Sequence, residues 1–131
     1  MREISSSGHG LYDLKYHFVW VTKQRKPVLE GSIGLRLREI IREVCSFYSV
    51  KILEGAVRPD HVHLLVSCPP TFSLSKIMRE VKGRTTRVIF QEFQELQEQF
   101  KGRHLWSRGF FVATTGTVSE ESIREYIKNQ S

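Results

Sequence analysis

The 131-residue chain has the length and composition of one soluble globular domain, with 40% hydrophobic and 26% charged residues. It contains no apolar run near the roughly 20 residues of a bilayer-spanning helix, and its N-terminal segment MREISSSGHG lacks the apolar stretch of a secretion signal, so we expect a cytoplasmic protein without a membrane partner. Twenty Lys and Arg residues against fourteen Asp and Glu give a formal charge of +6, as expected of a protein that meets phosphate backbones, although a merely basic surface would give the same balance.

The first half of the chain shows a strand pattern, a helix pattern and a second strand pattern. Residues Tyr12 to Val21 alternate between apolar and polar positions, which predicts a strand with one buried side. Apolar residues recur between Ile33 and Tyr48 at the spacing of an amphipathic helix. Val50 to Val57 predicts the second strand, and Arg58-Pro59-Asp60 predicts a short turn because proline presets the bend.

A third strand and a second helix follow this turn. The strand, His61 to Ser67, ends at Cys68-Pro69-Pro70. Ser73 is suited to cap a helix whose apolar stripe continues to Ile89. The two cysteines, Cys45 and Cys68, are far apart and have no Cys-x-x-Cys partner, so we expect reduced core residues.

The last third of the chain predicts one more strand and one more helix. Gln91 to Lys101 is polar and is either a helical extension or a linker. Phe110 to Thr114 predicts a fourth strand. Ser119 is expected to cap the last helix, where Glu120 and Glu121 in the first turn would favour the helix dipole.

The order of these elements predicts an α+β domain of the ferredoxin-like, split βαβ type. The order is β-α-β-β-α-β, an antiparallel sheet with helices on one side, followed by a C-terminal helix that carries Tyr126. Because Val62, Leu64 and Val66 are expected to face the helices, His61 and His63 should face away from them. His17 should also face away, so neighbouring first and third strands would bring three histidines to one face. A fold of this kind hosts many functions, so the site must decide the function.

The sequence His61-Val62-His63 is the first candidate site. Residues two apart in a strand project to the same side, roughly 6–7 Å apart at the backbone, so the two imidazoles can converge on one metal ion. A His-x-His pair on an exposed strand can also be incidental, and these residues alone leave both interpretations open.

Tyr126 and Gln130 are the second candidate site. They are four residues apart on the last helix and therefore lie one turn from each other on the same side. A glutamine amide oxygen is a competent hard ligand, and the phenol would then lie beside the metal. Taken alone, the pattern favours a core aromatic residue and a solvated C-terminal glutamine.

Basic residues form the third signal, and several stand near aromatic residues. Phosphate contacts with aromatic groups available for base stacking suit single-stranded nucleic acid, whereas a solvated helix face would give the same charges. The candidate DNA-contacting residues are Lys23, Arg25, Lys76, Arg79, Lys82, Arg84, Arg87, Arg103 and Arg108.

Five segments, in order along essentially the whole chain, resemble the single-tyrosine HUH transposases of the IS-two-hundred-like insertion sequences, where HUH denotes His-hydrophobe-His. Each motif is weak alone, but five in the right order and spacing are a strong resemblance. One departure is Arg108-Gly109, where the family often has Pro or Ser beside its Trp-Ser pair. The five segments are Tyr16–Lys23 (YHFVWVTK), Pro59–Val66 (PDHVHLLV), Leu105–Ser107 (LWS), Phe110–Gly116 (FFVATTG) and Tyr126–Gln130 (YIKNQ).

The resemblance implies a single HUH transposase domain over residues 1–131, with His61, His63 and Gln130 as metal ligands and Tyr126 as the nucleophile. Such enzymes cut and rejoin single-stranded DNA through a 5′-phosphotyrosine. They bind hairpins at the ends of the element and act as homodimers, in several of which the tyrosine helix completes the partner's histidine pair. Thr115-Gly116-Thr117 would be the hinge of that helix, because glycine adopts backbone angles closed to other residues.

The implied cofactor is a divalent metal, Mg²⁺ or Mn²⁺, and no nucleotide cofactor is expected. Two imidazoles are softer ligands than magnesium usually takes, so ligand chemistry alone favours Mn²⁺, and zinc would also be accepted. Asp60 and His17 are candidates to orient the ligands by contacting their side chains without binding the metal, although Asp60 could simply shape its turn.

Two alternatives to an active transposase remain open from the sequence. A domesticated relative that processes chromosomal repeat hairpins would share every motif. A non-catalytic module would bind single-stranded nucleic acid on its exposed sheet, but such a sheet should present aromatic residues, and the first strand presents Asp13, Lys15 and His17. Replication initiators and relaxases share the chemistry, but relaxases usually place the tyrosine before the histidines and are much larger.

Overall fold

A four-stranded antiparallel sheet of strand order β4-β5-β3-β6 organises the computed structural model, which describes residues 5–7, 10–12, 14–114 and 120–130. The two central strands pair over their whole length, from Lys15 opposite Ser67 to Val21 opposite His61. The four strands are β3 (Lys15–Val21), β4 (Lys51–Arg58), β5 (His61–Ser67) and β6 (Phe111–Thr114).

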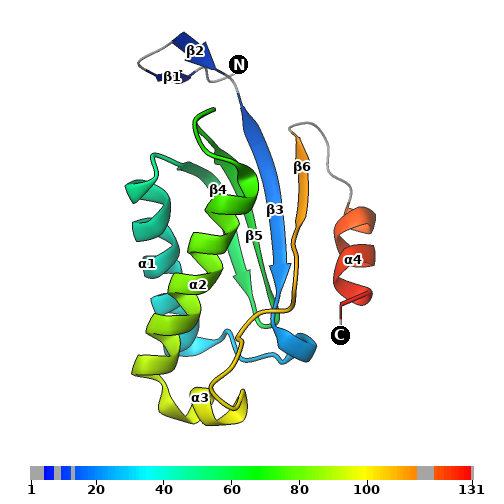
Figure 1. Cartoon of the computed structure of the whole chain (residues 1–131). Helices are drawn as coiled ribbons and strands as arrows, with labels where there is room; N and C mark the ends of the chain where they lie inside the picture. The colour runs from blue at the N-terminus through cyan, green and yellow to red at the C-terminus, as the bar shows by residue number, and fades with distance from the viewer. Residues whose placement is uncertain (1–4, 8–9, 13, 115–119, 131) are drawn as a thin grey trace.

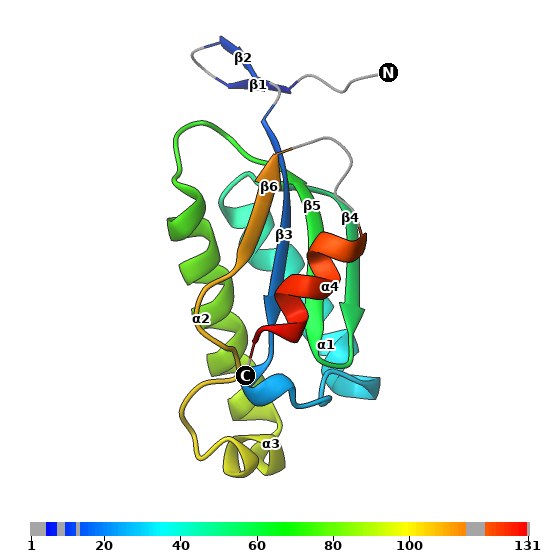
Figure 2. The same cartoon turned by 90° about the vertical axis from the view of Figure 1, so that its right-hand side faces the viewer.

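Helices lie on both sides of this sheet (Figure 1). The long helices α1 (Gly31–Phe47) and α2 (Leu74–Glu92) cover one side. The short helix α4 (Glu120–Lys128) lies on the other, and Figure 2, viewed from that side, shows it in front of the sheet. The remaining elements are the strand pair β1 (Ser5–Ser7) and β2 (Gly10–Tyr12), the 3₁₀ turn η1 (Lys23–Arg25) and the helix α3 (Gln94–Gln99).

The main core lies between the sheet and the two long helices. Phe18 and Trp20 of β3 point into it, and so do Val62, Leu64 and Val66 of β5, each at most 7% exposed. Alternation along a strand sends every second side chain to this face, so the apolar positions of β3 and β5 meet the apolar stripes of α1 and α2. The principal helix residues in this core are Leu37, Ile40, Ile41, Val44, Ile77, Met78, Val81 and Ile89.

The predicted α+β class and antiparallel sheet are confirmed, and several local predictions hold. Ser73 caps α2, and its side-chain oxygen accepts a hydrogen bond from the Lys76 amide at 3.1 Å. The segment predicted as either extension or linker begins with the last two residues of α2 and then forms α3, a separate helix that starts after a break at Phe93. Cys45 and Cys68 are free and buried, as expected.

Other local predictions differ from the structure. The strand predicted from Tyr12 to Val21 is two strands, because β2 ends at Tyr12 and pairs with β1, whereas β3 begins at Lys15. Both Ser119, predicted as a cap, and Thr115-Gly116-Thr117, predicted as a hinge, lie outside the described residues.

The second face of the sheet is partly covered, whereas the predicted fold, with helices on one side only, left this face open to solvent. Val19 and Val21 point to this face, yet neither side chain is exposed. Helix α4 lies over this side and contacts β3. Within the described part of the chain, no helix has the length and apolarity to cross a membrane.

Candidate active site

The face of the sheet beneath α4 carries three histidines from the two central strands. Along β5 the residues alternate between buried and half-buried, which turns His61 and His63 away from the main core. Strand β3 pairs with β5 so that Val21 lies opposite His61 and Val19 opposite His63. His17, two residues before Val19, projects to the same face.

His17 and His63 are in direct contact across the two strands. The Nδ1 atom of His17 lies 3.2 Å from Nε2 of His63, and the ring centroids are 5.4 Å apart. Burial lowers the pKa of His63, the neighbouring imidazoles of His17 and His61 lower it further, and Glu54 opposes this effect. These effects together favour a neutral His63, which is the protonation state that can bind a cation.

The carboxylate of Asp60 contacts the imidazole of His61. Its Nδ1 atom lies 2.9 Å from Oδ1 of Asp60, and Oδ2 of Asp60 lies 3.7 Å from Nε of Arg25. A carboxylate accepts hydrogen bonds, so a neutral His61 imidazole in this contact carries its proton on Nδ1 and its lone pair on Nε2. This arrangement orients an imidazole for metal binding through Nε2.

Glu54 is a residue of this face that sequence reasoning missed. A β-bulge between Ile52 and Glu54 shifts the register of β4, so Glu54 lies opposite Leu65 instead of pointing into the core. Together with His63 and Leu65, Glu54 lines a surface hollow of about 380 Å³. A bulge leaves no reliable trace in the apolar pattern of a single sequence, and the uneven alternation of Lys51–Arg58 was the only available signal.

Tyr126 lies on α4 and faces the sheet. Its ring packs against Phe111 of β6, with centroids 5.8 Å apart and a tilt of 53°. The hydroxyl is buried and has no hydrogen-bond partner in the described structure. Burial raises the pKa of the Tyr126 phenol. A buried hydroxyl without a partner is unfavourable, so a group that hydrogen-bonds to it would stabilise this arrangement.

The register of the sheet relates Tyr126 to the histidine face. Phe111 lies opposite Val19 on β6 and β3, and Val19 lies opposite His63 on β3 and β5. Phe111 and His63 thus occupy one row, with backbones about 10 Å apart across two strand spacings. Helix α4 runs toward the end of the sheet where β5 begins, and the half-buried Gln130 follows its last turn. No group of three His, Cys, Asp or Glu residues suited to hold a metal occurs among the described residues.

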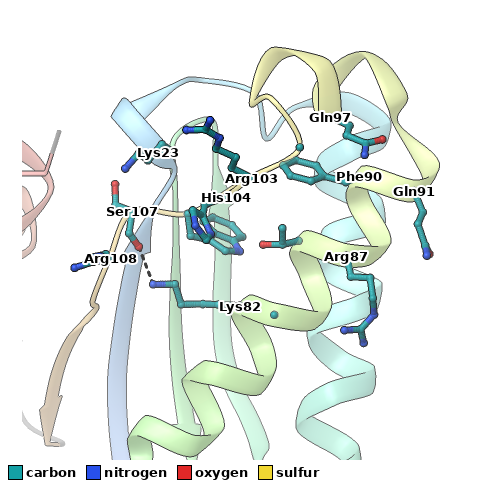
Figure 3. A pocket seen from close by; sticks show the side chains of 14 residues that line it. Lys23, Lys82, Arg87, Phe90, Gln91, Gln97, Arg103, His104, Ser107 and Arg108 are labelled. Atoms are coloured by element: carbon teal, nitrogen blue, oxygen red, sulfur yellow. Dashed lines mark hydrogen bonds between the residues drawn. The ribbon is translucent and has the colours of Figure 1, made fainter.

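The predicted DNA-contacting residues separate into groups. Five of them (Lys23, Lys82, Arg87, Arg103 and Arg108) line one hollow between α2 and the loop before β6 (Figure 3). Arg84 and Arg87 line a second hollow beside Phe47, whose side chain is 80% exposed. Arg25 contacts Asp60, and Lys76 and Arg79 lie on α2 and line neither hollow.

Comparison with known proteins identifies the family of the chain. Residues 10–130 match the family model described as "Transposase IS200 like". The chain belongs to the IS200-like transposase family. It is therefore an enzyme, and the resemblance drawn from its five motifs is confirmed.

Relatives of known function match this transposase over most of its length. The transposase of insertion sequence element IS200 from Salmonella typhimurium is 32% identical over 99% of this chain and 85% of its own length. The ISDra2 transposase TnpA of Deinococcus radiodurans is 31% identical over 92% of this chain and 86% of its own length.

Two solved structures resemble the transposase. A crystal structure of a Deinococcus radiodurans R1 protein assigned as a transposase superposes with a TM-score of 0.85 at 31% identity, over 96% of this chain and 97% of that one. A REP-associated tyrosine transposase bound to a REP hairpin has a TM-score of 0.59 at 17% identity, over 87% of this chain and 62% of that one, and shows a shared fold.

Proposed function

We propose that this transposase cuts and rejoins single-stranded DNA at insertion-sequence ends, using Tyr126 as the nucleophile. The observation that carries the proposal is the position of the Tyr126 hydroxyl, which is buried without a partner under α4, on the face of the sheet that holds His61 and His63. The strand order β4-β5-β3-β6 supports a ferredoxin-like arrangement, and we treat residues 1–131 as one HUH domain.

The proposed reaction exchanges one phosphoester bond for another. The Tyr126 oxygen attacks the phosphorus, the bond from phosphorus to the 3′ oxygen breaks, and the phenol proton ends on the released 3′-OH. The 5′-phosphotyrosine keeps the bond energy, so attack by a 3′-OH reverses the step and rejoins the DNA. The raised pKa of Tyr126 opposes this attack, so the phenol needs help from its surroundings.

His61, His63 and Gln130 are the proposed metal ligands. The orientation of His61 by Asp60 and the unpartnered Tyr126 hydroxyl fit a nearby divalent cation. Two imidazole nitrogens and one amide oxygen suit Mn²⁺ better than Mg²⁺, although either would serve. When bound, the cation would neutralise charge that develops on the scissile phosphate.

The proposed substrate is single-stranded DNA with hairpin ends, bound by a homodimer. The shared fold of the hairpin-bound transposase supports a hairpin, and the basic residues that line the hollows of α2 supply the charge for its phosphates. Helix α4 of either subunit could complete a histidine pair in such a dimer.

A non-catalytic nucleic-acid module is the weaker candidate. Base stacking on a sheet needs an open face with aromatic residues. Here α4 lies over the second face, and the ring of Phe111 packs on Tyr126. A domesticated relative that processes chromosomal hairpins would share all of this geometry and would differ only in its DNA.

A labelled single strand that contains a hairpin, incubated with Mn²⁺ and analysed on a denaturing gel, tests the proposal. We expect a covalent protein–DNA adduct with the unsubstituted chain and none with Tyr126→Phe. We expect His61→Ala to abolish cleavage while hairpin binding survives. An equal adduct yield from Tyr126→Phe would exclude Tyr126 as the nucleophile, and unfolding of His61→Ala would indicate a structural role for that histidine.

A further inference from the structure

The largest hollow that we describe lies on the α2 side of the sheet, away from Tyr126. It has a volume of about 710 Å³ and lies between α2, η1 and the loop that leads from α3 to β6. We call it the α2 groove. No Asp or Glu stands among the described residues that line it, whereas five Lys and Arg side chains do. This one-sided charge is complementary to a chain of phosphates.

The charged side chains differ in their freedom to bind a ligand. The ammonium of Lys82 donates to the carbonyl oxygens of Ser107 and Gly109, at 2.7 and 2.9 Å, and so ties α2 to the opposite wall (Figure 3). Burial lowers the pKa of Lys82. Arg103 and Arg108 on that wall and Lys23 at its end are exposed. Lys82 therefore joins the two walls of the groove, whereas the exposed side chains of Lys23, Arg103 and Arg108 are placed to contact phosphates.

The base of the groove is rigid. Trp106 is 5% exposed, and its indole Nε1 donates to Thr85 Oγ1 at 2.9 Å. The amide of Ser107 donates to Val21 O at 2.8 Å, and the amide of Lys23 donates to Leu105 O at 2.8 Å. The last residue of β3, Val21, which pairs with His61, and the first residue of η1, Lys23, thus both hold the loop in place.

Gly83 provides an independent observation. It lies inside α2, where glycine is less favourable than alanine. A Cβ atom built at Gly83 would meet nothing within 4 Å, so packing within the described chain gives no reason for a glycine there. The vacant position faces the groove, and a bare helix backbone is the surface against which a ligand can approach closely.

We propose that the α2 groove binds a single-stranded DNA segment adjoining the cleavage position, with the sugar–phosphate chain against Gly83. This site rests on the proposed function but is separate from the histidine face. The volume of about 710 Å³ is that of a pocket for small ligands, so the groove accommodates a few nucleotides. The exposed side chain of His104 also lines the groove, and a base of a single strand is free to stack on its ring.

A binding measurement without metal tests the groove separately from cleavage. The probes are a fluorescein-labelled single strand of 20 nucleotides and a labelled blunt hairpin, each titrated in EDTA and followed by anisotropy. The first matched pair is Gly83→Glu and Gly83→Gln, which are nearly equal in size and differ in charge. We expect both variants to weaken single-strand binding, because any side chain at position 83 keeps the sugar–phosphate chain away from the helix backbone. We expect Gly83→Glu to bind about tenfold more weakly than Gly83→Gln, because only Glu repels phosphate.

A second matched pair consists of two double variants, one that removes two positive charges from the groove and one that removes two from elsewhere on the surface. We expect Arg103→Gln with Arg108→Gln to weaken single-strand binding about tenfold and to lower the salt slope by about 1.4, at ~0.7 for each lost phosphate contact. Arg38→Gln with Arg42→Gln removes the same charge from exposed positions on α1 and should change affinity less than about twofold. Because a Cβ atom at position 83 meets nothing within 4 Å, the Gly83 pair keeps the test valid if the arginine variants fail to fold.

The outcomes separate the groove from the proposed function. Three results would each overturn single-strand binding in the α2 groove. They are equal affinities for Gly83→Glu and Gly83→Gln, equal losses of affinity in the two arginine pairs, and weakening confined to the blunt hairpin. Tyr126→Phe should bind the single strand normally. An unsubstituted chain that forms no adduct would defeat the proposed function and leave the binding result standing.

Discussion

Asp60 and His61 are adjacent in sequence, and Oδ1 of Asp60 lies 2.9 Å from Nδ1 of His61. The residue that begins β5 is thereby oriented by the residue that ends the turn before it. The same carboxylate lies 3.7 Å from Arg25 of η1. The first imidazole of the pair therefore has a fixed tautomer and a fixed ring orientation before any ligand arrives.

This contact predicts that Asp60→Ala weakens metal binding. We expect about 10–100-fold lower affinity for Mn²⁺, measured by calorimetry on metal-free protein, because His61 loses the acceptor that fixes its tautomer. Asp60→Asn keeps an acceptor oxygen and should lose less. Equal Mn²⁺ affinity in Asp60→Ala and the unsubstituted chain would mean that Asp60 only shapes the turn.

The contact between Phe111 and Tyr126 predicts how α4 is held on the sheet. Phe111→Ala removes the ring against which Tyr126 packs, so the amides of residues 123–130 should exchange with solvent about tenfold faster. Val112→Ala is the matched control, because Val112 lies on the same strand, faces the other side and is 37% exposed. If both variants accelerate exchange equally, the packing of Tyr126 on Phe111 does not hold the helix.

The buried hydrogen bond between Trp106 and Thr85 should contribute to stability. Thr85→Val keeps the shape but leaves the indole N–H without an acceptor, at a cost of about 1–3 kcal/mol in the free energy of unfolding by urea. Thr86→Val, at the next position and half-buried, should change stability by less than about 0.5 kcal/mol. Equal values for the two variants would show that the bond adds nothing measurable.

The buried cysteines predict a loss of stability at alkaline pH. Burial raises the pKa of Cys45 to about 12 and that of Cys68 to about 11. Thiols of the unfolded chain ionise near ~8.5, so the unfolded state releases protons first and stability falls as pH rises above that value. Urea unfolding between pH 8 and 10 should show a steeper decline for the unsubstituted chain than for Cys45→Ala with Cys68→Ala. An equal loss of stability with pH in both proteins would contradict the raised pKa of the two thiols.

The sequence predicted those parts of the fold that depend on periodic burial. The alternation of His61–Ser67 located both the strand and the outward side of the histidines, and Ser73 marked the start of α2 because a cap is a local interaction. The motifs also identified the family correctly.

Features that depend on distant contacts escaped prediction. The bulge that turns Glu54 toward His63 exists only because β4 pairs with β5, and α4 covers the second face through tertiary packing. Lys82 was predicted to contact phosphate, and its sequence position gave no sign that its ammonium also donates to two carbonyl groups of a loop 25 and 27 residues away. Charge alone cannot distinguish a cation that binds a ligand from one that joins two walls.

The most direct test of the central claim is the location of the DNA in the covalent adduct. An adduct formed with Mn²⁺ would be trimmed with nuclease, digested with trypsin and analysed by mass spectrometry. We expect the nucleotide on the peptide Glu125–Lys128, attached to Tyr126 as a phosphodiester. A nucleotide on Tyr16 or Tyr48, with an unmodified Glu125–Lys128 peptide, would contradict the assignment of Tyr126 as the nucleophile.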